Sequence, residues 1–240
     1  MKHFKLTEET KVNEFGVTLH RIECISNCKW AMAGEKGGWV QSESNLSGNA
    51  WVSGNAEVYG NAEVSGDAKV YGDAEVYDNA KVYGDAKVYG NAWVYGDAWV
   101  GGNAWVYGNA EVYGDAKVYG NAEVSGNAKV YGNAKVYGDA WVYGDAWVYG
   151  DAWVGGNAEV YGDAKVYGDA DYCVFQSFGS SCRSTTAYRG KDGGVSIKCG
   201  CFYGTLVEFE AKVKETHGDN KYAKEYLAII EVIKIKFGIK

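Results

Sequence analysis

The sequence predicts a mainly β protein whose central part consists of very short, regularly repeated strands. From Gly48 to Tyr167 the chain repeats Gly-Asn/Asp-Ala-X-Val-Tyr, with Val at every sixth position and Ala two residues before it. Successive side chains of a strand point to opposite faces, so Ala and Val line an interior while X and Tyr point outward. The 240 residues include 34 Gly and no Pro, as expected where nearly every backbone N–H donates to a neighbouring strand.

A Val with a small residue two places before it, repeated every six residues, resembles the hexapeptide-repeat β-helix proteins across residues 38–173. The resemblance implies a left-handed parallel β-helix with three hexapeptide strands per coil. The same register extends back to Val40 and forward to Tyr172, which predicts about seven to eight coils. We place the corners at Gly-Asn/Asp, because these residues adopt positive φ most readily.

Two segments flank the repeats and are expected to close the ends of the β-helix, since open strand edges invite polymerisation. We divide the chain into an N-terminal cap at 1–37, the β-helix at 38–173 and a C-terminal domain at 174–240. The alternating segment Val17–Ile22 predicts a strand that covers the first coil. The N-terminal cap is therefore predicted to be a β structure.

The C-terminal segment predicts a small α+β domain. Cys173–Phe175 and Val195–Cys199 are predicted to be strands. Thr205–Glu208 is a capping-box sequence, so a helix is expected to begin there and to end at Gly218. A second helix is predicted from near Asn220, and its apolar face contains Tyr222, Tyr226, Ile229, Ile230 and Ile233. The segment Ile233–Phe237 also alternates, which leaves a strand as the alternative there.

Charge and hydropathy argue against several classes of partner. The formal net charge is −7, and residues 48–170 hold seven Lys against six Glu and eleven Asp. We expect no nucleic acid as a partner, since nucleic acids select basic surfaces, and an anion should prefer the mildly basic residues 171–240. Apolar runs are shorter than the ~20 residues of a membrane span, and Met1–Glu8 lacks a signal-peptide core. A cytoplasmic protein that contacts no membrane is expected.

Outward aromatic residues form rows when positions 18 apart are stacked. One row is unbroken and contains Tyr59, Tyr77, Tyr95, Tyr113, Tyr131, Tyr149 and Tyr167. Three interpretations stay open: residues that simply favour strands, an interface for side-by-side packing in a homo-oligomer, with a trimer favoured, or a platform for planar ligands. On another face Gly101 and Gly155 replace Tyr, and Lys81 and Lys117 flank Trp99, which predicts cation–π contacts.

The sequence contains few residues in arrangements that would support catalysis or metal binding. The resemblance to hexapeptide-repeat acyltransferases implies a catalytic His, but His3, His20 and His217 all lie outside the repeats. Stacked corner residues such as Asp67 with Asp85 could attract Ca²⁺, although Asp simply suits corners. Zinc would have to use Cys199 and Cys201 with Cys173 or His217, at spacings that are not standard. We expect no enzyme activity, no metal and no cofactor.

One segment interrupts the monotony of the repeats with groups that recognise anions. The candidate ligand-binding residues are Arg183, Thr185, Thr186, Tyr188, Arg189 and Lys191. Arg binds phosphate or carboxylate in a bidentate manner, and the hydroxyls can orient what it holds. The alternative is that Arg183 and Arg189 pair with Glu208 or Glu210 and dock the first helix.

A second resemblance concerns the parts of the chain outside the regular repeats. The chain is similar there to hexapeptide-repeat proteins of bacteriophage and prophage genomes, in the segments Lys5–Thr7, Gly37–Val40, Ser44–Ser47, Ser184–Tyr188, Cys199–Phe202 and Glu208–Asn220. The resemblance implies a phage or prophage origin, in the cytoplasm of a bacterial host, without an established activity. We expect a non-enzymatic β-solenoid scaffold that self-associates and presents its terminal domain to a host protein. The alternative is a binding module that sequesters a small anionic, nucleotide-like ligand, and an acyltransferase comes third.

Overall fold

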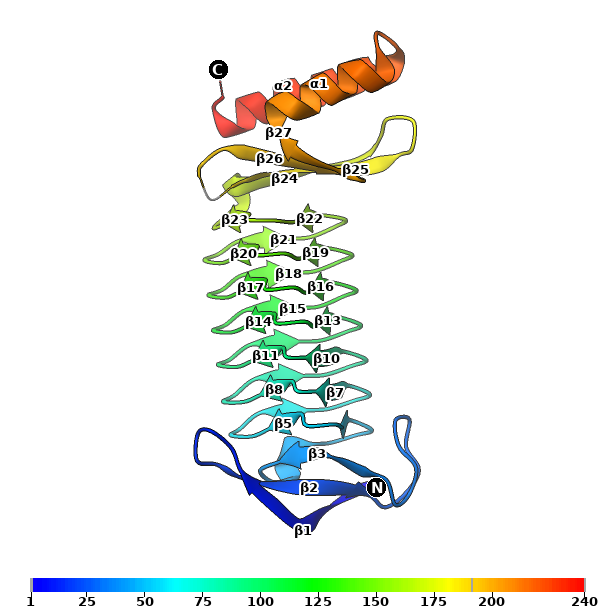
Figure 1. Ribbon diagram of the computed structural model, residues 1–240, viewed down its shortest axis with the longest axis vertical. Coiled ribbons are helices and arrows are strands. Elements are labelled where there is room, and N and C mark those ends of the chain that lie inside the picture. Colours follow the sequence, from blue (N-terminus) through cyan, green and yellow to red (C-terminus); the bar gives the residue numbers. More distant parts are fainter. Residues whose placement is uncertain (1, 191, 240) are drawn as a thin grey trace.

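The structure of the protein is a computed structural model that describes residues 2–190 and 192–239, and its main feature is a parallel β-solenoid (Figure 1). Three ladders of short parallel strands run along a rod. Strand partners lie 18 residues apart, as with Val94 and Val112, so three repeats make one coil. The ladders contain six, seven and eight parallel strands, which corresponds to about seven coils. The predicted mainly β fold is confirmed.

The strands of the solenoid are only two to five residues long. The first ladder contains β3 (Lys36–Val40), β5 (Glu57–Val58), β8 (Glu75–Val76), β11 (Trp93–Val94), β14 (Glu111–Val112), β17 (Lys129–Val130), β20 (Trp147–Val148) and β23 (Lys165–Val166). The second contains β4 (Trp51–Val52), β7 (Lys69–Gly72), β10 (Lys87–Gly90), β13 (Trp105–Val106), β16 (Glu123–Val124), β19 (Trp141–Val142) and β22 (Glu159–Val160). The third contains β6 (Glu63–Val64), β9 (Lys81–Val82), β12 (Trp99–Val100), β15 (Lys117–Val118), β18 (Lys135–Val136) and β21 (Trp153–Val154).

The interior of the rod is a continuous column of Val and Ala. Every repeat Val from Val52 to Val166 is fully buried, which confirms the predicted inward positions. The corners have positive φ, for example 66° at Gly102, where a Cβ would lie 3.0 Å from the backbone nitrogen of Gly120. Backbone N–H groups donate from coil to coil, as from Trp93 to the Ala110 carbonyl at 2.9 Å. A proline would break this ladder.

The N-terminal cap extends the first ladder beyond the first coil (Figure 1). Strand β1 (Phe4–Val12) pairs antiparallel with β2 (Thr18–Cys24), which pairs antiparallel with β3. Phe4 and Ile22 are buried in the core that continues into the solenoid. The segment predicted as a strand corresponds to β2, and β1 was not predicted. A short 3₁₀ helix (Glu43–Asn45) follows β3.

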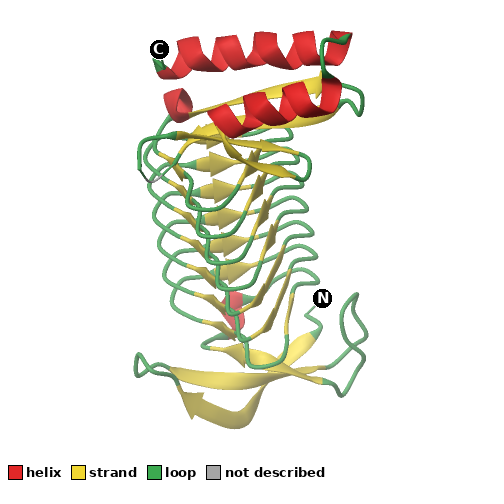
Figure 2. Cartoon of the chain, turned by 45° about the horizontal axis from the view of Figure 1, so that its top comes forward, coloured by secondary structure: helices red, strands yellow, loops and turns green. Residues whose placement is uncertain are grey.

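The C-terminal cap is a four-stranded antiparallel sheet covered by two helices (Figure 2). After a 3₁₀ helix at Asp169–Asp171 come β24 (Tyr172–Phe178), β25 (Arg183–Arg189), β26 (Val195–Cys199) and β27 (Phe202–Thr205), paired in that order. Tyr172 therefore begins the antiparallel sheet, and the repeat expected at this position is wrong. The predicted strands at 173–175 and 195–199 are confirmed, whereas β25 and β27 were not predicted.

Both predicted helices are present. Helix α1 (Leu206–His217) begins at the Thr205–Glu208 capping box and ends at Gly218. Helix α2 (Lys221–Phe237) begins after Asn220, whose side chain accepts from the N–H of Tyr222 and Ala223. The end of α2 is helical because Ile230, Ile233 and Phe237 lie on its buried face at helical spacing. The alternative of a strand at 233–237 is thus wrong. No helix in the described parts of the chain is long and apolar enough to cross a membrane.

Candidate functional site

The terminal strand β25 holds most of the residues predicted to bind an anion, and the structure buries three of them. Thr186 and Tyr188 face the last coil of the solenoid. The Thr186 hydroxyl accepts from the backbone N–H of Glu159 at 3.0 Å, and the Tyr188 hydroxyl donates to the carbonyl of Tyr161 at 2.9 Å. These two side chains close the end of the rod, and a ligand cannot reach them.

The opposite face of β25 points toward the helices. The buried Thr185 hydroxyl donates to the Cys199 thiol at 3.2 Å. Arg189 pairs with Asp171 at 3.3 Å, and its guanidinium lies 5.4 Å from the centre of the Phe237 ring. Arg189 therefore helps to dock α2, and its partner is Asp171 instead of the predicted Glu208 or Glu210. Lys191 lies outside the described residues.

Arg183 is the predicted residue that stays exposed. Its side chain crosses the turn between β26 and β27, where Gly200 has a φ of 57°. A Cβ at position 200 would lie 2.8 Å from the Arg183 Cδ and 3.0 Å from its Cζ. The five predicted residues that the structure describes do not form one site, because alternate residues of β25 face opposite sides of the sheet.

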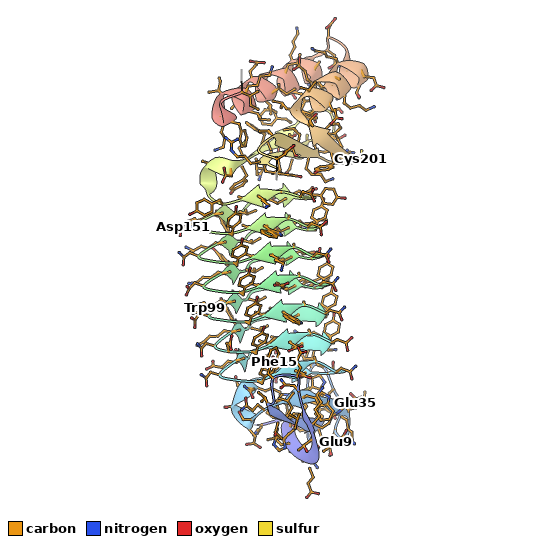
Figure 3. All side chains as sticks on the ribbon, turned by 60° about the vertical axis from the view of Figure 1, so that its left-hand side comes forward. Glu9, Phe15, Glu35, Trp99, Asp151 and Cys201 are labelled. Carbon is orange, nitrogen blue, oxygen red and sulfur yellow. The ribbon has the colours of Figure 1, made fainter. Side chains whose placement is uncertain are left out.

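The cysteines are reduced thiols that lie in both caps. Burial raises the pKa of the Cys173 thiol to about 11, so it is protonated and unreactive near neutral pH. Cys201 lies exposed near the terminal sheet (Figure 3). Within residues 2–190 and 192–239, no group of three or more His, Cys, Asp or Glu side chains could hold a metal ion.

The unbroken row of tyrosines forms a stacked ladder on the first face of the rod. We call this the tyrosine face, and it contains Tyr59, Tyr77, Tyr95, Tyr113, Tyr131, Tyr149 and Tyr167. Neighbouring rings lie 4.8–5.1 Å apart over most of the ladder, and the Tyr77 and Tyr95 rings are parallel within 1°. The Tyr59 hydroxyl donates to Glu75 of the next coil at 2.8 Å, and the Tyr95 hydroxyl donates to Glu111 at 3.4 Å.

The N-terminal cap covers the start of this ladder. Phe15, in the turn between β1 and β2, lies 6.2 Å from the Tyr59 ring and 6.0 Å from the Tyr77 ring (Figure 3). Tyr59 is only 5% exposed. Of the seven tyrosines in this ladder, all of which the structure describes, Tyr167 alone is an exposed side chain. The first two tyrosines predicted to form an oligomer interface are therefore already covered from within the chain.

Exposed aromatic rings are most numerous on the third ladder, although Trp105 and Trp141 of the second ladder are exposed as well. We call this the notched face; it consists of residues 63–65, 81–83, 99–101, 117–119, 135–137 and 153–155. Tyr83, Trp99, Tyr119 and Trp153 are 38–46% exposed. The ring of Tyr83 folds over Gly101, and that of Tyr137 folds over Gly155. The sequence analysis noted that these two glycines replace Tyr. The repeat could not predict which outward side chains are exposed.

Charged groups are arranged in rows on and beside the notched face. Lys117 lies 4.4 Å from the centre of the Trp99 ring, and Lys135 lies 3.9 Å from that of Trp153. The predicted cation–π contact of Lys117 is confirmed, whereas Lys81 pairs with Glu63 at 3.9 Å. The corner next to this face carries Asp97, Asp115 and Asp151; Trp99 and Asp151 lie along the same side of the rod (Figure 3).

The stacked corner residues are bridged by hydrogen bonds. Asn side chains donate to the residue one coil on, as from Asn79 to Asp97 at 3.0 Å. Lys29 from the N-terminal cap bridges Asp67 and Asp85, the pair considered for Ca²⁺. An ammonium group thus occupies the place between these two carboxylates.

Comparisons with known proteins agree with this fold. The family model described as the YdcK beta solenoid repeat matches residues 86–102 and 128–144, both within the rod. A search of the curated proteins finds no match. The family match supports a repeat β-solenoid and carries no information about a partner or ligand.

Proposed function

We propose that this protein is a non-catalytic scaffold whose rods associate side by side through the notched face. The observation that carries the proposal is that this face has more exposed aromatic rings than either of the other two faces. Tyr83 and Tyr119 lie in one column of outward residues, and Trp99 and Trp153 lie in the neighbouring column with Lys117 and Lys135. Extended aromatic patches on soluble proteins usually mark contacts with another molecule.

Caps cover the first and the last coil of the rod. The antiparallel strands β1 and β2 lie beyond the first coil, and the terminal sheet closes the last coil through Tyr188. At the N-terminal end, a ring nitrogen of His3 lies 3.0 Å from the carbonyl oxygen of Ala50. Because caps cover both ends, direct stacking of one rod's coils on another's is prevented, and contact through the sides is the alternative that we propose.

The occupant that fits the notched face best is a second copy of the chain. Lys81, Lys117 and Lys135 run down its middle, while Asp97 and Asp115 run down the adjoining corner. Two rods related by a two-fold axis, face to face and slightly offset, would place each lysine row beside the partner's aspartates. Such an isologous contact is the commonest kind in homo-oligomers. The aromatic rings would then be buried between the rods.

The origin and the absence of catalysis belong to the same proposal. The resemblance of the flanking segments to phage and prophage proteins supports a phage or prophage gene product that acts in the bacterial cytoplasm. The repeats contain no His, and His217 stacks on Tyr226 in the terminal domain. A rod that repeats the same chemistry at each coil suits a scaffold better than a single active site.

Sedimentation velocity on two matched pairs of substitutions tests the proposal. Trp99→Ser with Trp153→Ser removes two exposed rings of the notched face, and the apparent association constant should fall at least tenfold. Tyr113→Ser with Tyr131→Ser removes two rings of the tyrosine face and should leave association within twofold of the wild type. A reversed outcome would assign the interface to the tyrosine face and contradict the proposal.

A further inference from the structure

A cavity of about 290 Å³ lies in the C-terminal domain between the terminal sheet and the helices. Its lining comes from the loop before β25 and the start of β25, from the turn between β26 and β27 with the residues beside it, from α1, and from Tyr226 of α2. Its size suits a molecule of one ring with a small head group, near the lower end of ligand pockets. The cavity lies away from the notched face and takes no part in the proposed contact between rods.

The charged groups that line the cavity are basic. Arg183 and Lys212 contribute a guanidinium and an ammonium group, and His217 contributes an imidazole. Among the described residues no Asp or Glu lines the cavity. The nearby carboxylate of Glu225 is occupied, since it accepts from the backbone N–H of Gly179 at 2.9 Å. Lys212 pairs with Glu215 at 2.9 Å, so the attraction for an anion in the cavity would come mainly from Arg183.

Arg183 is available to a ligand. No hydrogen bond or ion pair joins its guanidinium to another residue in the described part of the chain, whereas Arg189 on the same strand pairs with Asp171. The Arg183 side chain lies against Gly200, where a Cβ would be 2.8 Å from the Arg183 Cδ. An unpaired guanidinium at the edge of a cavity is a ready anion-binding group.

The walls of the cavity are aromatic. The Phe202 and Phe209 rings lie 5.2 Å apart, and the Phe209 ring meets the Tyr226 ring edge-on at 5.7 Å. His217 stacks on Tyr226 with ring centres 5.7 Å apart and an interplanar angle of 24°. A planar ligand ring could stack on the faces of these aromatic side chains or pack against their edges.

The Tyr226 ring, which lines the cavity, packs closely against a glycine. At Gly179, where φ is 73°, a Cβ would lie 2.5 Å from the Tyr226 Cζ. Burial raises the pKa of the Tyr226 hydroxyl to about 12, so the group is a neutral donor at physiological pH. Its hydroxyl donates to the carbonyl of Phe178 at 3.5 Å, a long contact that a ligand oxygen could replace.

We propose that this cavity binds a small aromatic anion, with its phosphate or carboxylate group at Arg183 and its ring against Phe209 and Tyr226. The site differs from the six residues predicted from the sequence, of which only Arg183 lines it. The residues from α1 and α2 could not be assigned to it without knowing how the helices pack on the sheet.

The chain provides its own reporter for a test, since His217 is one of only three histidines. We would titrate full-length protein with phenyl phosphate and follow the imidazole signals by NMR, with His217 assigned from a His217→Asn variant. The His217 signals should shift in a saturable manner, while those of His3 and His20 in the distant N-terminal cap stay unchanged. Phenol and inorganic phosphate, each carrying half of the probe, should bind at least tenfold more weakly. Benzoate in place of phenyl phosphate distinguishes a carboxylate from a phosphate head group.

Two variants decide whether the shift reports the proposed contact. Arg183→Gln should raise the Kd of the tighter aromatic anion at least tenfold, with an unchanged melting temperature because the side chain is exposed. Lys214→Gln removes the same charge from the outer side of α1, where Lys214 pairs with Glu210, and should leave the Kd within twofold. The proposal is overturned if neither aromatic anion gives a saturable shift, or if both variants bind equally well.

Discussion

The ring of Tyr83 lies directly over the backbone of Gly101, one coil further along the rod. A Cβ at position 101 would lie 2.5 Å from the Tyr83 Cε2, so the ring occupies space that any other residue would fill. The same relationship joins Tyr137 to Gly155, three coils away. The two glycines thus let tyrosine rings lie flat on the notched face and give it its shape.

Gly101→Ala with Gly155→Ala should therefore weaken association more than it weakens the fold. Neither glycine has a positive φ, so the backbone tolerates alanine, but both tyrosine rings must move outward. We expect a loss of association of at least tenfold in sedimentation, with a melting temperature within a few degrees of the wild type. Ser125→Ala on the second ladder is the matched control and should change neither quantity. Unchanged association in the double variant would show that the ring positions do not matter.

A buried charge should distinguish the inside of the rod from its outside. Val64→Asp places a carboxylate where Val64 is fully buried, which costs several kcal/mol unless the group is protonated. Glu63→Asp introduces the same residue one position earlier, on the exposed side, and should change the stability by less than about 0.5 kcal/mol. Chemical denaturation of both variants measures the difference. Equal stabilities would contradict the assignment of Val to the interior.

The tyrosine face should make the rod sensitive to alkali. Burial raises the pKa of Tyr77 to about 12, and it raises that of Tyr95 further. An unfolded tyrosine has a pKa of about 10. Because the folded values are higher, the stabilisation is complete below pH ~10 and is lost as the pH rises through ~12. Absorbance at 295 nm and circular dichroism should thus change together in this window.

The alkaline titration has a clear contrary outcome. If the stacked tyrosines ionise near pH 10 while the circular dichroism of the solenoid stays native, the rings are not buried as described. Between pH 7 and 9 the same spectra should be constant and serve as the reference.

The junction between the rod and the terminal sheet includes a hydrogen bond from the backbone N–H of Glu159 to the Thr186 hydroxyl. Thr186→Val removes the acceptor of the backbone N–H of Glu159, and an unpaired buried N–H costs about 1–3 kcal/mol. Hydrogen exchange of the Glu159 amide should accelerate by one to two orders of magnitude. Thr185→Val on the opposite face of β25 leaves that amide bonded and should not accelerate its exchange. Protection that is equal in both variants would remove Thr186 from the closure of the rod.

The rod could be predicted from the sequence because each repeat contains the residues that determine its local conformation. Ala and Val alternate with outward residues, and a Gly stands at each corner except at Asp78, which itself adopts a φ of 57°. Because no insertion interrupts the repeat, the assignment of inward and outward positions stays correct from one coil to the next. The prediction failed only at Tyr172, where the spacing continues but the chain turns into an antiparallel sheet.

The candidate sites depended on contacts that no local pattern reports. Thr185, Thr186 and Tyr188 looked like a ligand-binding set because hydroxyls and Arg are close in sequence. They lie in a strand between two layers, so alternate side chains are buried on opposite sides. The cover of Phe15 over Tyr59 likewise joins residues 44 positions apart in sequence and could not be inferred from the repeat.

Sedimentation velocity of the wild-type chain at rising concentration tests the central claim most directly. A single chain has a mass of 26.1 kDa. We predict that the weight-average mass exceeds this value at micromolar concentration, increases with concentration, and falls toward that of the single chain when salt screens the Lys and Asp rows. A mass that stays at 26.1 kDa up to high micromolar concentration would contradict a scaffold that associates through its sides.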